Sequence, residues 1–233
     1  MFFVASLIHI RVYPTSVHLL LNGLVGIVLG LRAALAIPLG IFLQAVLVQH
    51  GGFTTLGVNC CDMVLPALFV GGMFRALQHL PLFRRVWFRA GLVFIALAAW
   101  LFCLLYSSIL LLSSNEAGPE RAQDITFRPV TIAVVMACAG IAAWIESRLE
   151  SVPEFALGLL SGLVAVLLTA FLTSMVLAYG GLEPQSWRKL AQIMFVVHVP
   201  VALIEGIVLG FTVSFLARVK PEMISQPAAK QPP

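Results

Sequence analysis

The stretch QAVLVQHGGFTTLGVNCCDM, residues 44–63, places a histidine and a glycine-rich polar loop between two apolar runs. Each apolar run is able to enter a bilayer as part of a helix. A polar loop between two such helices indicates a functional site, because irregular backbone at a membrane is tolerated only where protein or water satisfies its polar groups. The stretch therefore predicts the class of the fold and the place of its chemistry together.

The composition of the whole chain agrees with this interpretation. Of its 233 residues, 61% are hydrophobic and 10% are charged, and the mean hydropathy is +1.03. An ordinary soluble domain carries about 25% charged residues, so these values exclude that class. We predict an integral membrane protein that does not bind nucleic acid.

Uncharged stretches that approach or exceed the length of a transmembrane helix, about 20 residues, recur along the sequence. Transmembrane strands would alternate apolar and polar residues over about ten positions, and that alternation is missing. The predicted fold class is all-α, a polytopic transmembrane helix bundle of about seven spans. The clear spans correspond to residues 12–31, 33–61, 90–115, 155–182 and 190–217, the last broken only by Glu205. Shorter candidates lie at 59–78, which carries Asp62 and Arg75, and at 129–145, and an apolar remnant lies at 2–10.

The distribution of basic residues predicts the orientation. By the positive-inside rule, basic links lie in the cytoplasm, and counting spans from them places the charged loop 114–127 outside. This predicts a multi-pass protein of the plasma (inner) membrane with a cytoplasmic C-terminus, followed by a proline-rich, disordered tail at 225–233. The basic residues that decide this are Arg75, Arg84, Arg85 and Arg89 in one link, and Arg218 and Lys220 after the last span.

Two histidines fall at the outer rim in this orientation. His18 stands at the start of the first full span, and His50 stands at the end of the second. Imidazole is a good ligand for divalent Co, Ni, Cu and Zn, so the pair predicts half of a four-coordinate metal site. The competing interpretation is that both are interfacial side chains without a ligand.

The loop that follows His50 fits either interpretation. Its glycines allow the backbone to fold back close to an ion, while Thr54, Thr55 and Asn59 satisfy the exposed amides. The alternative is a flexible external turn, with Asn59 or Asp62 acting as a helix cap.

His198 and Glu205 form a candidate intramembrane polar pair, since seven residues place them on about the same face of one helix. A carboxylate inside a membrane is costly and indicates a functional site. Glu205 either pairs with His198, takes up a proton, or bonds to neighbouring helices. A structural polar clamp is at least as well supported as a role in transport.

Three blocks of the sequence resemble the CbiM/NikM family, the substrate-capture components of energy-coupling factor transporters for cobalt or nickel. The blocks are TSVHLLLNGLVGIVLG at 15–30, LQAVLVQHGGFTTLGVN at 43–59 together with Met63, and HVPVALIEGIVLGFTVSFLARVKPEMI at 198–224. They stand in the order of the family, and the HGG-x-TTLG-x-N block is quite specific.

The resemblance implies that the chain captures Co²⁺ or Ni²⁺ from outside as a transported substrate, without an organic cofactor. Such uptake is linked to cobalamin biosynthesis or to nickel supply. The resemblance implies His18 as a metal ligand and His50 as a ligand or a residue directly behind the ligands. The residues implied to surround them are Asn22, Thr54, Thr55, Asn59 and Met63.

The implied partners are a transmembrane coupling subunit, ATPase subunits and a small accessory membrane subunit. Membrane lipid surrounds the bundle. No G-x-x-x-x-G-K-[ST] phosphate-binding loop occurs in the sequence. ATP hydrolysis is therefore expected in the partners, and the chain is expected to be a transport component and not an enzyme.

Two departures from the family pattern keep alternatives open. Family members begin with Met-His, whereas this chain begins Met1-Phe2, and the resemblance implies that the family's helix before the TSVH block is missing. Either the start is truncated, or another chain supplies the missing part, or this member no longer captures metal in that way. The second departure is residues 91–151, interpreted as an extra helix pair inside a transmembrane domain of residues 1–224.

The alternatives in function follow from these departures. One is a structural or degenerate membrane subunit without metal capture. The other is a bis-histidine haem carrier, with His18 and His198 opposed across the bundle. An intramembrane metalloprotease is excluded, because no H-E-x-x-H pattern occurs.

Overall fold

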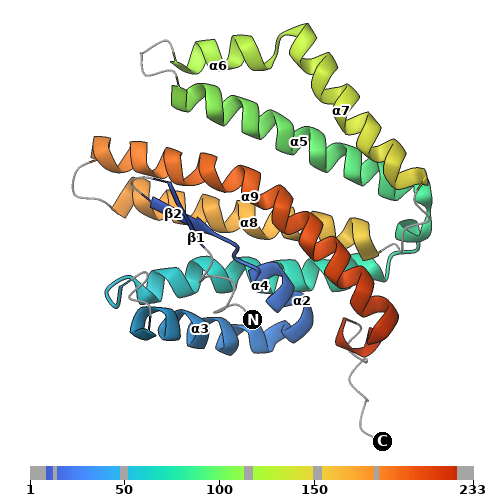
Figure 1. The fold of residues 1–233 in the computed structure, drawn as a ribbon, viewed down its shortest axis with the longest axis horizontal. Coiled ribbons are helices and arrows are strands. Elements are labelled where there is room, and N and C mark those ends of the chain that lie inside the picture. The colour runs from blue at the N-terminus through green and yellow to red at the C-terminus, as the bar shows by residue number, and fades with distance from the viewer. Residues whose placement is uncertain are drawn as a thin grey trace, which may run out of the picture.

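The computed structural model describes residues 9–12, 15–47, 52–112, 118–148, 154–180 and 184–224 of the chain. Within these ranges the chain forms a helical bundle that carries one small hairpin near its start (Figure 1). The helices are α2 (Asn22–Leu29), α3 (Ala33–Leu47), α4 (Leu56–Gln78), α5 (Val86–Leu112), α6 (Gly118–Thr126), α7 (Pro129–Arg148), α8 (Glu154–Gly180) and α9 (Pro184–Val219). Short 3-10 helices lie at η1 (Gly30–Arg32), η2 (Pro81–Arg84) and η3 (Pro221–Met223).

Six helical stretches of the described chain are long and apolar enough to cross a membrane. One is the stretch Asn22–Leu47, which comprises α2, η1 and α3, and the others are α4, α5, α7, α8 and the greater part of α9. The prediction of a polytopic helix bundle is confirmed, with one span fewer than the approximate seven. In the loop predicted at 114–127 the chain forms the nine-residue helix α6.

The difference in the number of spans arises at residues 12–31. Here the chain forms strands β1 (His9–Val12) and β2 (Thr15–His18), which pair antiparallel with Val12 opposite Thr15. Helix α2 has only eight residues and ends at Leu29; the next residue, Gly30, has a φ of 58°, which suits a glycine. An uncharged run indicates a span only if it is also helical, and the β-branched residues Val12, Thr15 and Val17 favour strand.

Consecutive long helices run in opposite directions, so that the ends of the bundle alternate along the chain (Figure 1). The link between α4 and α5, the end of α7 and the end of α9 lie together at one end. This end carries the basic segments on which the orientation was predicted. The end of α3, helix α6 and the start of α9 lie at the opposite end.

Helices α8 and α9 pack backbone against backbone through facing glycines. A Cβ atom on Gly162 would lie 2.6 Å from the Cα of Gly206, and one on Gly158 would lie 2.7 Å from the Cα of Gly210. The two glycines of each helix are four residues apart, the spacing that lets membrane helices approach closely. Helices α2 and α4 cross in the same manner, because a Cβ on Gly26 would overlap the backbone carbonyl of Ala67.

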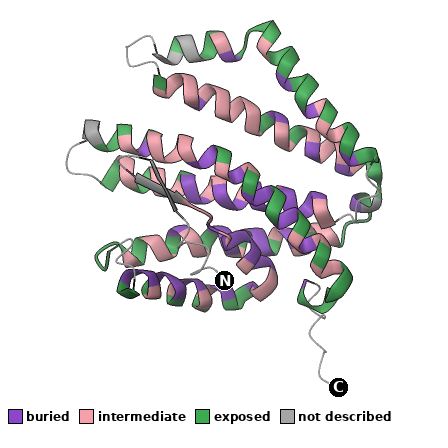
Figure 2. Cartoon of the chain, viewed as in Figure 1, coloured by how far each residue is buried: buried purple, intermediate pink, exposed green. Residues whose placement is uncertain are grey.

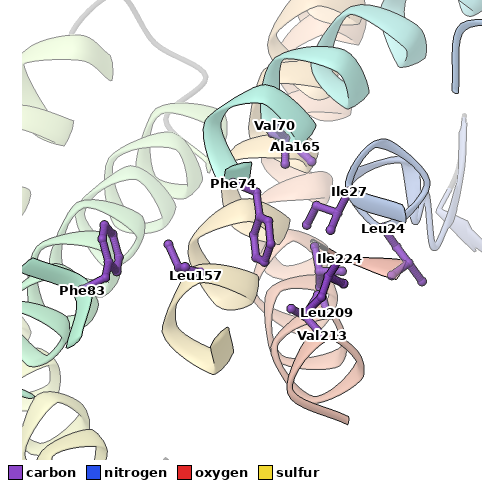
Figure 3. Close-up of a cluster of buried hydrophobic side chains, with 10 residues drawn as sticks. All are labelled: Leu24, Ile27, Val70, Phe74, Phe83, Leu157, Ala165, Leu209, Val213 and Ile224. Carbon is purple, nitrogen blue, oxygen red and sulfur yellow. The ribbon is translucent and has the colours of Figure 1, made fainter. Parts of the chain in front are cut away.

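Buried side chains concentrate in α2, in α8 and on the sides of α4 and α9 that face them (Figure 2). Helices α5, α6 and α7 lie at one side of the bundle and are largely intermediate or exposed (Figures 1 and 2). One apolar cluster joins α2, α4, η2, α8 and α9 near the end that holds the basic segments (Figure 3). Its buried members are Leu24, Ile27, Val70, Phe74, Phe83, Leu157, Ala165, Leu209, Val213 and Ile224.

A buried ion pair joins α5 to α7. Nε of Arg89 lies 3.6 Å from Oε1 of Glu146, and Nη1 of Arg89 donates to the carbonyl of Phe83 at 3.2 Å. The interpretation of 91–151 as an extra helix pair within a domain of residues 1–224 stays a prediction. The predicted tail, 225–233, lies outside the described residues.

Candidate functional site

A short non-helical segment, residues 19–21, connects β2 to α2 and lies at the centre of the candidate site. Glu205 of α9 is 2% exposed, and its carboxylate accepts the backbone N–H groups of Leu20 and Leu21. The N–H of Leu21 lies 2.9 Å from Oε2. An unpaired backbone N–H in the apolar interior of a membrane is strongly unfavourable. Glu205 therefore satisfies the backbone that leads into α2.

The backbone of Leu21 explains why this segment needs support. Its φ of 50° and ψ of 14° lie in the left-handed region, which a bulky side chain rarely adopts. Such a conformation persists when its surroundings hold it in place. Glu205 provides this support, and its oxygens also supply acceptors at the N-terminus of α2, where backbone N–H groups have no partner within the helix.

Asn22, the first residue of α2, joins three helices. Its Nδ2 donates to Oγ1 of Thr169 in α8 at 2.8 Å and to the carbonyl of Met63 in α4 at 3.4 Å. Its Oδ1 accepts the N–H of Gly23 at 2.9 Å, and the side chain is fully buried. Thr169 in turn donates to the carbonyl of Ala165 at 2.9 Å. The start of α2 is thus held from two sides, by Glu205 and by Thr169.

A second polar contact lies one turn along α8. Oγ1 of Thr173 donates to Oδ2 of Asp62 at 3.0 Å, and Asp62 is 6% exposed. Together, Asn22 with Thr169 and Asp62 with Thr173 tie α8 to both α2 and α4. Because α4 begins at Leu56, Asp62 and Asn59 lie inside the helix, and neither acts as its cap.

His18 is half-buried at the end of β2, one residue before the segment that Glu205 holds. Its Nδ1 lies 3.1 Å from the carbonyl oxygen of Leu19. A carbonyl only accepts, so this bond places the proton on Nδ1 and the lone pair of the neutral ring on Nε2. In the hairpin register His18 stands opposite His9. His50, the other predicted ligand, lies outside the described residues.

The predicted polar pair His198 and Glu205 have separate partners. Nδ1 of His198 donates to the carbonyl of Met194 at 2.7 Å, one turn back along α9. The carboxylate of Glu205 accepts from the backbone N–H groups of Leu20 and Leu21. Of the roles weighed for Glu205, bonding to a neighbouring segment is the one that these contacts display.

The loop before α4 contains the remaining predicted residues. Thr54 is exposed, and Oγ1 of Thr55 donates to the carbonyl of Gly52 at 3.4 Å. Nδ2 of Asn59 donates to Oγ1 of Thr55 at 3.3 Å. The side chain of Met63 packs against two apolar clusters while its carbonyl accepts from Asn22. Through this carbonyl, Met63 is bonded to the start of α2.

Among the described residues, no group of three or more His, Cys, Asp or Glu side chains is placed to hold a metal ion. The described residues instead provide a buried polar scaffold, which we define as the carboxylate of Glu205 and the side chains of Asn22 and Thr169. This scaffold fixes the backbone directly after His18. Chemically, it can hold one imidazole in place at the edge of the bundle.

Sequence reasoning missed Thr169 of this scaffold, Thr173 with its bond to Asp62, and the facing glycines of α8 and α9. The glycines carry a readable signal, because small residues four apart recur in two apolar runs. The threonines carry none, since a threonine inside a membrane helix commonly bonds to its own backbone.

The family model for CbiM, described as a cobalt uptake substrate-specific transmembrane region, matches residues 1–149 and 121–223. A protein named "Putative metal transport protein" from Haemophilus influenzae is 44% identical over 75 residues, which are 32% of this chain and 36% of that protein. The matched segment thus spans little more than a third of the length of that relative. No solved structure matches the chain.

Proposed function

The chain belongs to the CbiM family, and from this membership we propose that it is the substrate-capture component of a cobalt or nickel uptake transporter of the energy-coupling factor type. It takes Co²⁺ or Ni²⁺ from the outer side of the plasma membrane and passes the ion on for cobalamin biosynthesis or nickel supply. The ion is the transported substrate of the protein.

The observation that carries this proposal is the way Glu205 holds the backbone next to His18. Two hydrogen bonds from the backbone of residues 20 and 21 to the buried carboxylate of Glu205 fix the chain immediately after His18. A ligand whose main chain is fixed loses little conformational freedom when it binds an ion. The pairing of His9 with His18 in the hairpin adds a second imidazole-bearing position next to the first.

The residues then have distinct roles. His18 binds the ion through Nε2, because Nδ1 bears the proton in its bond to Leu19. His50 is a second ligand or supports one from behind. Asn22 does not touch the ion and positions the segment through Thr169 and the carbonyl of Met63.

We infer the orientation from the distribution of basic residues. We infer the energy-supplying partners from the family and from the lack of an ATP-binding loop in this sequence. We infer that the end of the bundle with the basic segments faces the cytoplasm, so that the end of α9 lies there and the end of α3 lies outside. A transmembrane coupling subunit and ATPase subunits work with this chain and supply the energy.

The test is elemental analysis of the detergent-purified protein after incubation with Co²⁺ or Ni²⁺ and removal of unbound ions. The variants are His18→Ala and, as a matched control, His79→Ala, because His79 is an exposed histidine at the other end of α4. We expect stoichiometric metal on the wild type and on His79→Ala, and none on His18→Ala.

Two results would contradict the proposal. Wild-type protein that retains neither ion would favour a structural subunit without capture. Equal loss of metal in both variants would show that His18 has no special part in binding. Circular dichroism of each preparation shows whether the helices are intact, so that a misfolded variant is recognised before its metal content is read.

A further inference from the structure

A groove runs between α5 on one side and α8 and α9 on the other, with a volume of about 690 Å³. It lies toward the end of the bundle where α8 ends and α9 begins. Residues that line it include Tyr106 and Leu110 of α5, Tyr179 of α8, and Arg188, Gln192 and Phe195 of α9.

Trp100 marks the point from which the groove opens. Its Nε1 donates to the carbonyl of Val199 at 2.6 Å and so fastens α5 to α9 near the middle of both helices. The lining residues of α5 all follow Trp100 in the sequence, and those of α9 all precede Val199. The groove is therefore the space left where α5 parts from α8 and α9 beyond this bond.

The inner part of the groove suits a hydrocarbon chain. Phe171, Phe195 and Val196 line it, and the hydroxyl of Ser107 donates to the carbonyl of Cys103 in its own helix. Few polar groups are therefore left to hold water in this part. At membrane depth an apolar groove of this size is filled by lipid or by another protein segment.

The rim of the groove suits a phosphate. Arg188 is exposed in the first turns of α9, and no carboxylate of the described residues forms an ion pair with it. Arginine recognises phosphate through several parallel donors. Tyr179 of the same rim and nearby Trp187 are exposed aromatic residues of the kind that settle at the level of lipid headgroups.

We propose that this groove binds one phospholipid, with an acyl chain between α5 and α8–α9 and its phosphate against Arg188. The charge of Arg188 and the apolar lining belong to opposite ends of the same groove, as the two parts of a lipid do. The site is separate from the residues of the scaffold around Glu205 and does not depend on metal capture.

Native mass spectrometry of the purified, delipidated protein with added phosphatidylglycerol tests the proposal. Three variants are compared with the wild type: Arg188→Gln removes the charge, Ala178→Phe fills the groove, and Lys189→Gln removes a neighbouring charge that does not line it. We expect one retained lipid on the wild type and on Lys189→Gln. Arg188→Gln should weaken retention about tenfold, the loss of a single charged hydrogen-bonded contact, and Ala178→Phe should abolish it.

Several results would overturn the proposal. Equal retention by all four proteins would mean that lipid binds the general surface. Diacylglycerol retained as strongly as phosphatidylglycerol would show that the phosphate makes no contact. A crosslink from Cys103, which lines the groove, to the helix of another polypeptide in native membranes would assign the groove to a protein partner.

Discussion

Glu205 accepts the backbone N–H of Leu21 at 2.9 Å, although 184 positions separate the two residues in the sequence. A carboxylate in the middle of α9 thereby determines the backbone of a segment between β2 and α2. This contact explains why an acid lies within the membrane. Without the carboxylate, the two N–H groups of the irregular segment would lack a hydrogen-bond acceptor.

Replacing Glu205 by Gln should weaken both the fold and metal binding. The amide oxygen can accept one N–H, but the amide nitrogen would then meet the second N–H donor and leave it unsatisfied. We expect a loss of about 1–3 kcal/mol in unfolding free energy and a measurable fall in affinity for Co²⁺ by isothermal titration calorimetry.

The matched control is Glu222→Gln, which changes an exposed carboxylate of η3. It should leave the thermal unfolding midpoint and the affinity at the wild-type values. If Glu205→Gln behaves like this control, the carboxylate does not support the segment before α2.

Asn22 and Thr169 should show energetic coupling in a double-mutant cycle. The variants Asn22→Ala and Thr169→Val each remove one partner of the 2.8 Å bond, and the double variant removes both. We expect a coupling energy of about 0.6 kcal/mol and at most about 1.7 kcal/mol, the range found for hydrogen bonds between membrane helices. Additive effects, measured by reversible unfolding in detergent, would argue against the bond.

Gly162→Ala should destabilise the protein because the added Cβ would meet the backbone of Gly206 in α9. The cost of such overpacking is about 1–3 kcal/mol. Gly72→Ala is the control, since a Cβ at this position of α4 meets no atom within 4 Å. The yield of monodisperse protein and its thermal unfolding midpoint should fall for Gly162→Ala only.

The ion pair between Arg89 and Glu146 predicts that one substitution is worse than two. Arg89→Met or Glu146→Leu alone leaves a buried charge and should cost about 3–5 kcal/mol. The double substitution removes both charges, so it should be more stable than either single variant in the same unfolding assay. A double variant as unstable as the sum of the singles would show that the pair is not coupled.

Much of the fold could be predicted from apolar length alone. The runs that became α5 and α8 lack charged side chains for longer than a bilayer requires, and the run within α9 is interrupted only by Glu205. The same criterion failed at residues 12–31. The absence of charged residues shows that a run is compatible with lipid, but it does not show that the run is helical. The left-handed backbone of Leu21 could not be predicted, because a leucine gives no indication of that conformation.

The site could be predicted only in part. His18 and Glu205 are unusual residue types for their surroundings, so they are visible in a single sequence. Their relation is not visible, because Glu205 acts on the backbone of residues 20 and 21, whose side chains are ordinary leucines. The bond from Asn22 to Thr169 likewise joins distant positions, and a single sequence does not specify which helices become neighbours.

The position of Glu205 also sets an order of assembly. Synthesis delivers the chain from its N-terminal side, so residues 20 and 21 are made long before α9 leaves the ribosome. Until then their N–H groups lack the acceptor that they have in the finished bundle. The segment next to His18 is therefore among the earliest parts of the protein to be made and among the last to reach its final shape. A nascent chain that stalls ahead of α9 would carry His18 without the support that fixes it.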